Sequence, residues 1–475
     1  MRKSYKIILM VISILLIGSI IIGTSYSIWV KTAIQKEQNI VNSSCFDIEF
    51  TESSNINLTN AIPISDEAGL KKKPYTFTLK NTCNMNSKVT IALDVLSTST
   101  MSSSAIKTSL TKGNKSGTPK LLTSLDKKAE VDISGAKEAY ILGTDIIGAN
   151  KSKSYSLYLW MDEAVTVAEA SKSFNSKVVI VNTATEEEPP LEILGREITD
   201  TTQIATDDPD NNIRYIGANP NNYVYFNCSD YSNQSDSTCE KWRIIGVFKN
   251  MTKKDGSKAD LVKIIRDDSL GSIAWDSNGV NDWSTASLQT TLNGTYYNGT
   301  YATGALKNDS TRNAIESVVW NLGGTASYTS ASNGLASHWY GYERGTTVYS
   351  GHAPTWPGKI GLMYPSDYGY ATAGGTTTNR ASCLAKELYN WDGSGVSDCK
   401  NNDYLLKGYS QWTLVPYSSY SNLAFYVYSS GSVLDDYGGV NRTYAVRPVA
   451  FLKSNISITN VGTGTSESPF QLKVG

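Results

Sequence analysis

Histidine is scarce in this chain of 475 residues, which contains only His338 and His352. Zinc peptidases typically hold their metal through a His-Glu-x-x-His motif on a helix. Neither histidine stands in such a motif. The two could meet Glu343 around a metal, but loop histidines at unmatched spacing more often make ordinary hydrogen bonds. We therefore predict no metal site and no peptidase activity by this route.

Other catalytic signatures are missing as well. The chain has no Cys-x-x-Cys motif, so a zinc ribbon or a thioredoxin-type site is unsupported. No Gly-x-Ser-x-Gly elbow stands between a strand and a helix, and no P-loop glycine pattern occurs. We name no catalytic residues and expect a protein that is not an enzyme. A hydrolase or oxidoreductase hidden in the long loops is the less favoured alternative.

Charge is also sparse, because only 18% of residues are charged and the net charge is −1. A balance near zero gives no electrostatic footprint for nucleic acid, which we exclude as a partner. Ser, Thr, Asn, Gly and Tyr carry the polarity instead. Such a composition favours β-structure with many turns and suits a surface exposed outside the cell.

The first residues predict a membrane segment. Arg2, Lys3 and Lys6 precede residues 7–30, which contain no charge, and Lys31 follows. This run is long enough to span a bilayer core of about 30 Å. The positive flank indicates that the N-terminus stays inside and that the chain continues on the extracytoplasmic face. Residues 1–31 are therefore a membrane anchor or, if they are cleaved, the signal segment of a secreted protein.

Six cysteines follow this segment. An even number of cysteines in an exported chain indicates disulfides, although sequence alone leaves the connectivity open. We choose nearest-neighbour pairing because each pair then lies inside one domain: Cys45 with Cys83, Cys228 with Cys239, and Cys383 with Cys399. Six buried free thiols are the alternative.

Hydrophobic periodicity divides the remainder into two domains. Apolar residues alternate with polar ones in several short runs of residues 40–185, which predicts an all-β sandwich. These runs are Phe46–Phe50, Tyr75–Leu79, Val89–Val95 and Tyr155–Met161. The acidic, proline-containing stretch Glu186–Pro190 cannot be a central strand, and we expect a linker over residues 186–200.

Residues 201–475 differ in kind, since they hold most of the ten tryptophans. We expect strands at Tyr223–Phe226, Trp242–Phe248, Leu261–Ile265, Leu423–Tyr428 and Tyr444–Leu452. Two helices are predicted, one capped by Ser284 and ending at Gly294, the other capped by Ser310 and ending at Gly323. Long loops fill residues 325–379. This mixture predicts an α+β domain.

The first domain resembles the TasA/camelysin-like family of secreted β-sandwich proteins. The motifs that carry the resemblance are Cys45–Phe50, Asn57–Pro63 and Leu157–Glu163. Some members of that family form matrix fibres and others are described as surface metallopeptidases. The resemblance implies a secreted sandwich, and fibre formation is one function that it allows.

The second domain resembles an uncharacterised domain of bacterial surface proteins, itself similar to the C-type-lectin-like fold of formylglycine-generating enzymes. The motifs are Trp242–Gly246, Trp283–Leu288, Leu292–Tyr297, Ile360–Tyr368, Trp412–Leu414 and Ala445–Val449. This resemblance implies a fold and a location on the cell surface, and it supplies no ligand. Cys383 and Cys399 have the spacing of a structural disulfide rather than of a reactive pair.

Two further patterns suggest ligands. Asp207, Asp208, Asp210 and a second group at Asp276–Asp282 supply hard oxygen atoms, so calcium is an open alternative to no cofactor. Aromatic side chains stack on sugar rings and anchor protein interfaces. The candidate ligand-binding residues are those in or beside the long loops: Trp339, Tyr340, Tyr342, Trp356 and Tyr364. The alternative is that these aromatic residues fill a loop-rich core.

These observations favour an exported, membrane-tethered surface protein that binds glycan or protein ligands without catalysis. A structural matrix or fibre protein is the alternative.

Overall fold

The computed structural model describes residues 31–34, 46–50, 57–59, 61–113, 117–166, 169, 171–185, 191–302, 304–393, 395–435, 438–459 and 461–474. Residues 1–30 of the expected membrane segment, Cys45 and linker residues 186–190 lie outside these ranges. Within them, no helix has both the length and the apolar character that a membrane crossing requires. The chain divides into two compact units, Met1–Pro190 and Leu191–Gly475. Strands account for 37% of residues and helices for 15%, which confirms a mainly β protein with few helices.

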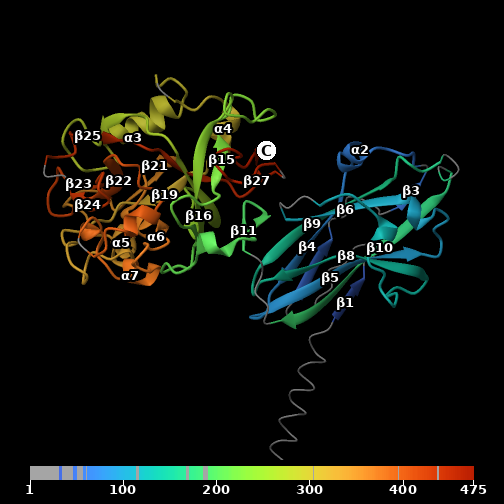
Figure 1. The fold of residues 1–475 in the computed structure, drawn as a ribbon. Coiled ribbons are helices and arrows are strands. Elements are labelled where there is room, and N and C mark those ends of the chain that lie inside the picture. Colours follow the sequence, from blue (N-terminus) through green and yellow to red (C-terminus); the bar gives the residue numbers. More distant parts are fainter. Residues whose placement is uncertain are drawn as a thin grey trace, which may run out of the picture. The chain divides into compact units, whose positions relative to one another are not determined.

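Two antiparallel sheets form the first unit (Figure 1). One sheet has the order β1-β10-β5-β8, and β3 also pairs with β10. Its strands are β1 (Lys31–Ile34), β3 (Asn57–Thr59), β5 (Asn86–Leu96), β8 (Ala136–Ile147) and β10 (Ser173–Thr185). The other has the order β2-β4-β9-β6-β7. Its strands are β2 (Phe46–Phe50), β4 (Tyr75–Asn81), β6 (Ile106–Lys112), β7 (Lys120–Leu121) and β9 (Ser152–Met161).

The core of this unit lies between the two sheets. Val89, Ile91 and Leu93 of β5 contribute from one sheet, and Phe77 and Leu157 contribute from the other. The alternation in the sequence places every second side chain on the inner face, because successive residues of a strand point to opposite sides. The short helix α2 (Asp66–Leu70) is capped by Ser65. Its Gly69 rests on the ring of Trp160, where a Cβ atom would come within 2.4 Å.

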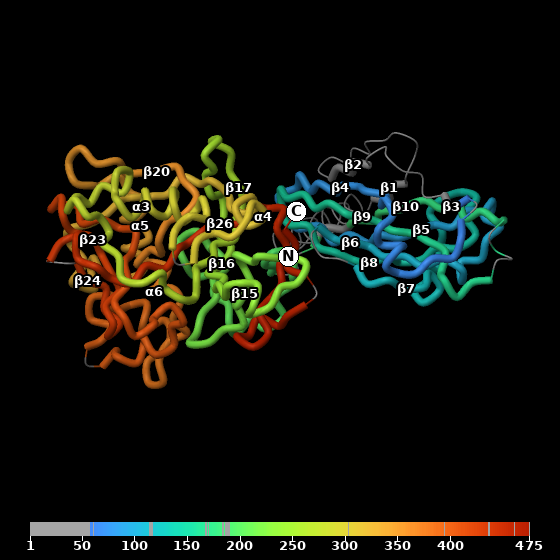
Figure 2. Tube along the Cα trace, turned by 90° about the horizontal axis from the view of Figure 1, so that it is seen from above, coloured from blue at the N-terminus to red at the C-terminus, as the bar shows by residue number. Residues whose placement is uncertain are grey.

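A large mixed arrangement of strands, helices and loops forms the second unit. Its main sheet has the order β13-β14-β16-β17-β26-β21, with β15 also paired to β16. Figure 2 shows β16, β17 and β26 side by side. The strands are β13 (Ile204–Ala205), β14 (Ile213–Tyr215), β15 (Tyr223–Phe226), β16 (Glu240–Thr252), β17 (Lys258–Arg266), β21 (Ile360–Gly361) and β26 (Val449–Leu452).

A smaller sheet has the order β18-β25-β22-β23-β24. Its strands are β18 (Ser272–Ala274), β22 (Gln411–Pro416), β23 (Ala424–Val427), β24 (Val433–Asp435) and β25 (Thr443–Ala445). Three strand pairs stand apart: β11 (Glu192–Ile193) with β12 (Arg196–Glu197), β19 (Val318–Asn321) with β20 (Thr355–Gly358), and β27 (Ser457–Ile458) with β28 (Leu472–Lys473). The helices are α3 (Ser287–Thr291), α4 (Asp309–Ala314), α5 (Ala336–Glu343), α6 (Pro365–Ala371) and α7 (Arg380–Leu384).

Both predicted helices differ from the structure. The helix expected from Ser310 to Gly323 is the short α4, capped by Asn308, and Val318–Asn321 is the strand β19. β-branched and aromatic residues favour a strand wherever a partner is available, and β20 supplies that partner. The helix expected at Ser284 begins instead at Ser287, because the distant carboxylate of Asp276 accepts the Ser287 N–H at 2.8 Å.

Residues that we assigned to the linker belong to the second unit. β11 and β12 form a two-residue hairpin in which Leu194 and Gly195 both have positive φ, 50° and 75°. Ile193 and Leu194 are buried in the core of this unit. The stretch is short and follows the acidic, proline-containing residues 186–190, so the sequence pattern alone resembles a linker.

The predicted strand Tyr444–Leu452 is also divided. β25 ends at Ala445 and β26 begins at Val449, since Pro448 lacks the N–H that a continuous strand would need.

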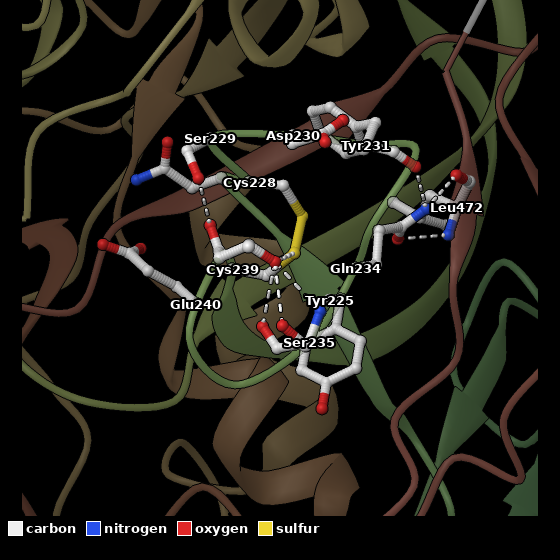
Figure 3. Close-up of a disulfide and its surroundings, with 12 residues drawn as sticks. Tyr225, Cys228, Ser229, Asp230, Tyr231, Gln234, Ser235, Cys239, Glu240 and Leu472 are labelled. Atoms are coloured by element: carbon white, nitrogen blue, oxygen red, sulfur yellow. Dashed lines mark hydrogen bonds between the residues drawn. A yellow bond between two sulfur atoms is a disulfide. The ribbon is translucent and has the colours of Figure 1, made fainter.

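Disulfides link Cys228 with Cys239 and Cys383 with Cys399, as nearest-neighbour pairing predicts. Cys83 is also disulfide-bonded. Figure 3 shows the first of these bridges, which closes the loop of residues 229–238. Inside that loop, the Gln234 side chain donates to the Leu472 carbonyl at 2.7 Å and accepts the Leu472 N–H at 2.9 Å. The bridged loop therefore holds β28 in place.

Candidate functional site

The five aromatic residues singled out from the sequence do not gather on one open surface. Trp339, Tyr340 and Tyr364 are 0%, 3% and 4% exposed, so their rings belong to the interior. Trp339 packs edge-on against Phe425, with ring centroids 4.6 Å apart. The Tyr364 hydroxyl donates to the Asn321 carbonyl at 3.0 Å. A ligand has no access to these three side chains, and we do not retain them as contact residues.

The other two are partly exposed and have structural contacts. The Tyr342 hydroxyl donates to the Asn333 carbonyl at 3.0 Å. Trp356 stands opposite Trp320 in the β19–β20 pair and covers Gly358, where a Cβ atom would come within 1.8 Å of the Trp356 ring. These aromatic residues fill a loop-rich core, as the alternative interpretation of the sequence expects. Their positions do not form a shared cleft.

Each of the two histidines contacts a residue close to it in the sequence. The His338 Nδ1 atom accepts the Leu335 N–H at 3.3 Å at the start of α5, and the His352 ring lies 5.2 Å from that of Tyr349. Glu343 is fully buried and bonds to Ser366. Across the described part of the chain, no group of three His, Cys, Asp or Glu residues is placed to hold a metal ion.

The acidic clusters considered for calcium are already engaged by the protein. The Asp276 carboxylate accepts the N–H groups of Asn278, Val280 and Ser287. Asp208 accepts from Arg214 at 2.5 Å, and the Asp207 carboxylate lies 2.7 Å from the Arg380 guanidinium. These carboxylates therefore organise loops and ion pairs with the same oxygen atoms that a calcium ion would need.

A buried ion cluster connects α5 and α6 with β14 and β17, and it comprises Asp208, Arg214, Lys263, Glu343 and Asp367. Asp367 sits at its centre, where it pairs with Lys263 and lies 3.1 Å from the Arg214 guanidinium. Asp367 and Lys263 are 1% and 0% exposed. Burial lowers the pKa of Lys263 to about 8, against the opposing effect of Asp367.

Glu343 is a member of this cluster whose pKa lies close to neutral pH. Burial raises its pKa to about 7, although Arg344 at 3.2 Å and the hydrogen bonds from Ser366 oppose the shift. Clusters of shifted groups occur at active sites but also in structural networks. The cavity described below is lined by other residues, and we interpret the cluster as a structural network.

We predict that Glu343→Gln flattens the pH dependence of stability between pH 4.5 and 7. The folded-state pKa lies above the ordinary value of 4.5, so the folded protein holds the proton more tightly. This stabilisation is complete below pH 4.5 and is lost as pH rises toward 7, by about 3 kcal/mol. Urea unfolding followed by tryptophan fluorescence at several pH values measures the slope. Equal slopes in both proteins would refute the assignment.

A different set of aromatic residues reaches the surface. Trp412, Tyr426, Tyr428 and Tyr444 form what we call the aromatic ladder, on the smaller sheet of the second unit. Strands β22, β23 and β25 carry three of them, and these strands are neighbours in the sheet. β22, β23 and β24 lie together in Figure 1. Trp412 and Tyr426 are direct cross-strand partners and therefore project from the same face.

The exposure of the four side chains differs along the ladder. Tyr444 stacks on Tyr426 with ring centroids 4.5 Å apart and lies 4.7 Å from Trp412. A hydrogen bond orients the Trp412 ring, because its indole N–H donates to the Ile273 carbonyl at 3.0 Å. Trp412 and Tyr426 are 2% and 8% exposed, whereas Tyr428 is 42% exposed and Tyr444 is half-buried. The exposed Tyr428 and the half-buried Tyr444 thus pack against the buried rings of Tyr426 and Trp412.

Protein-family models, curated proteins and solved structures yield no match to this chain. The ladder offers flat aromatic surface and the exposed Thr443 beside Tyr444. Tyrosine suits a binding surface because a large amphipathic ring is ordered at the loss of only two torsions.

Sequence reasoning missed this group for a specific reason. Leu423–Tyr428 is predicted as a strand and Trp412–Leu414 is a motif of the family resemblance, and aromatic residues in strands are usually core residues. The available signal was the i, i+2 spacing of Tyr426 and Tyr428, which places both on one face at the end of a strand.

Proposed function

We propose that the protein is a non-catalytic surface protein whose second unit binds glycan through the aromatic ladder. The observation that carries this proposal is the exposed Tyr428 beside the half-buried Tyr444, which stacks on Tyr426. The apolar faces of sugar rings pack against such aromatic surfaces, while neighbouring hydroxyl groups supply hydrogen bonds. A preorganised surface loses little entropy when it binds.

The location and the finer fold are part of the same proposal. Residues 7–30 would tether the chain, with its two units on the extracytoplasmic face. The disulfides support this placement, because they persist in oxidising compartments. The TasA/camelysin-like sandwich and the C-type-lectin-like fold implied by the sequence motifs are proposed for the first and second units. Labelled glycan that binds intact cells, and is released by surface proteolysis, would support this location.

The ladder is tested by glycan and cell-wall-polymer binding to the full chain in detergent micelles, with and without calcium. We expect Tyr444→Ala to weaken binding by about tenfold, because the loss of a stacking ring removes roughly 1–3 kcal/mol. Tyr428→Ala should weaken it less, since the Tyr428 ring is not stacked on its neighbour but lies at 88° to the Tyr426 ring, with centroids 6.2 Å apart.

Tyr420→Ala is the matched control. Tyr420 is 58% exposed but lies in the loop between β22 and β23, at the other end of β23 from Tyr428. Equal losses in Tyr420→Ala and Tyr444→Ala would contradict a ladder-specific site. No binding by the well-folded wild-type chain would reject the glycan proposal and shift weight to the structural fibre alternative, which concentration-dependent assembly would reveal.

A further inference from the structure

The first unit contains a cavity of about 340 Å³ at one open side of its two sheets. Strands from both sheets contribute to its wall. Its lining includes Thr108, Leu110 and Lys112 of β6, Lys120 of β7, Leu125, and Leu142 of β8. A volume of this size falls within the range of small-molecule sites, about 300–1,000 Å³.

The cavity arises where the two sheets lack edge coverage. β8 is the last strand of its sheet, and β7 extends the other sheet by only two residues. Leu110, Leu125 and Leu142 are half-buried and pack against the core of the unit. The Lys112 side chain crosses from β6 to the other sheet, where its ammonium donates to the Thr144 carbonyl at 2.5 Å. An apolar floor is thus bounded by a cationic side chain.

Thr108 supplies the feature that points to a ligand. Its side chain is 3% exposed, yet its hydroxyl oxygen has no hydrogen-bond partner. A buried polar atom without a partner destabilises a fold by about 1–3 kcal/mol, so such atoms are rare. Thr108 lines the cavity, and a bound polar group there would satisfy its hydroxyl.

Charge identifies the sign of that polar group. Thr108 and Lys120 are directly opposite each other in the β6–β7 ladder, so both side chains leave the same face. The charged side chains in the cavity wall are Lys112 and Lys120, and no carboxylate is among its described lining residues. An anionic group beside Thr108 would therefore meet a hydroxyl donor and two ammonium groups.

We propose that this cavity binds a small amphipathic anion, of the class of medium-chain aliphatic carboxylates. The chain lies against Leu110, Leu125 and Leu142, and the carboxylate lies beside Lys120 with the Thr108 hydroxyl donating to it. This site belongs to the first unit and is independent of the glycan-binding proposal for the second.

Photo-labelling of the full chain tests the site, with a decanoate analogue that carries a diazirine and peptide mapping of the product. We expect labelled peptides from β6 and β8, competed by octanoate and not by octanol. Thr108→Val keeps the shape and removes the hydroxyl, and it should reduce this labelling about fivefold. Lys120→Gln should reduce it about threefold. Leu142→Trp fills the cavity and should abolish it.

The control is Lys73→Gln, which removes an exposed lysine that does not line the cavity and should label like wild type. Thermal unfolding shows whether each variant is folded. If Leu142→Trp does not fold, Thr108→Val still tests the site. Labelling of β6 and β8 that is unchanged in Thr108→Val and Lys120→Gln would overturn the proposal. So would equal labelling by the diazirine analogue of decanol, since the anion would then have no role.

Discussion

Asp367→Asn is expected to destabilise the second unit by about 3–5 kcal/mol. The substitution leaves Lys263, which is 0% exposed, and Arg214, which is 1% exposed, beside a neutral amide. Asp367 contacts both of them and also accepts the Tyr364 N–H at 2.9 Å. Removing one member of a buried ion pair leaves an uncompensated charge in a medium that cannot hydrate it. Urea unfolding at neutral pH, followed by tryptophan fluorescence, measures the loss.

The matched control is Asp255→Asn, because this carboxylate lies on an exposed turn with a salt bridge of 3.9 Å to Lys253. It should change stability by less than about 0.5 kcal/mol. The double variant Asp367→Asn with Lys263→Met should lose less than the sum of the two single variants, since it removes charge of both signs. Additive losses would show that the pair is not coupled, which would contradict the geometry.

Trp339→Ala is expected to destabilise the same unit by about 3–5 kcal/mol. The indole is 0% exposed and touches Phe425, Tyr328 and Tyr342 with ring centroids 4.6, 5.7 and 6.2 Å apart. Truncation would open a cavity at the point where α5 meets the smaller sheet. Stability and glycan binding should be measured on the same preparation. Loss of a contact residue lowers binding at unchanged stability, whereas loss of a core residue lowers stability at unchanged affinity.

A core role predicts that Trp339→Ala lowers the unfolding midpoint, and that the protein still folded binds glycan with unchanged affinity. Trp339→Phe, which keeps an aromatic ring, should recover part of the lost stability. A variant with wild-type stability and abolished binding would show that Trp339 is a ligand contact after all. It would reject the assignment of this residue to the core.

The sequence allowed the strands to be predicted better than their assembly. β15 coincides with the predicted run Tyr223–Phe226, and β4, β5 and β9 cover the predicted alternating runs of the first unit. Alternation is a local property, so it can be recognised without knowledge of the partner strand. The residues Val318–Leu322 fit a helical face equally well, and only pairing with β20 decides their conformation.

The candidate site depended on information that the sequence does not carry locally. Trp339 and Tyr444 are both aromatic and both lie near glycine-rich or polar residues, yet one is buried and the other reaches solvent. Their exposure is set by contacts with segments many residues away, such as Phe425 for Trp339. The unpartnered hydroxyl of Thr108 could not be predicted from the sequence either, because it depends on how the edges of the two sheets are separated.

The contact between Gln234 and Leu472 has a consequence for when the second unit can form. Phe470 completes the free side of β15 through the Tyr225 N–H and the Tyr223 carbonyl, and Leu472 is held by the bridged loop. These partners are more than two hundred residues apart, 238 in the case of Gln234 and Leu472. Pairing at such separation is slow because a long loop must close first. An unfinished chain therefore presents β15 with one open edge, so folding of this unit is a late event that follows synthesis of residue 472.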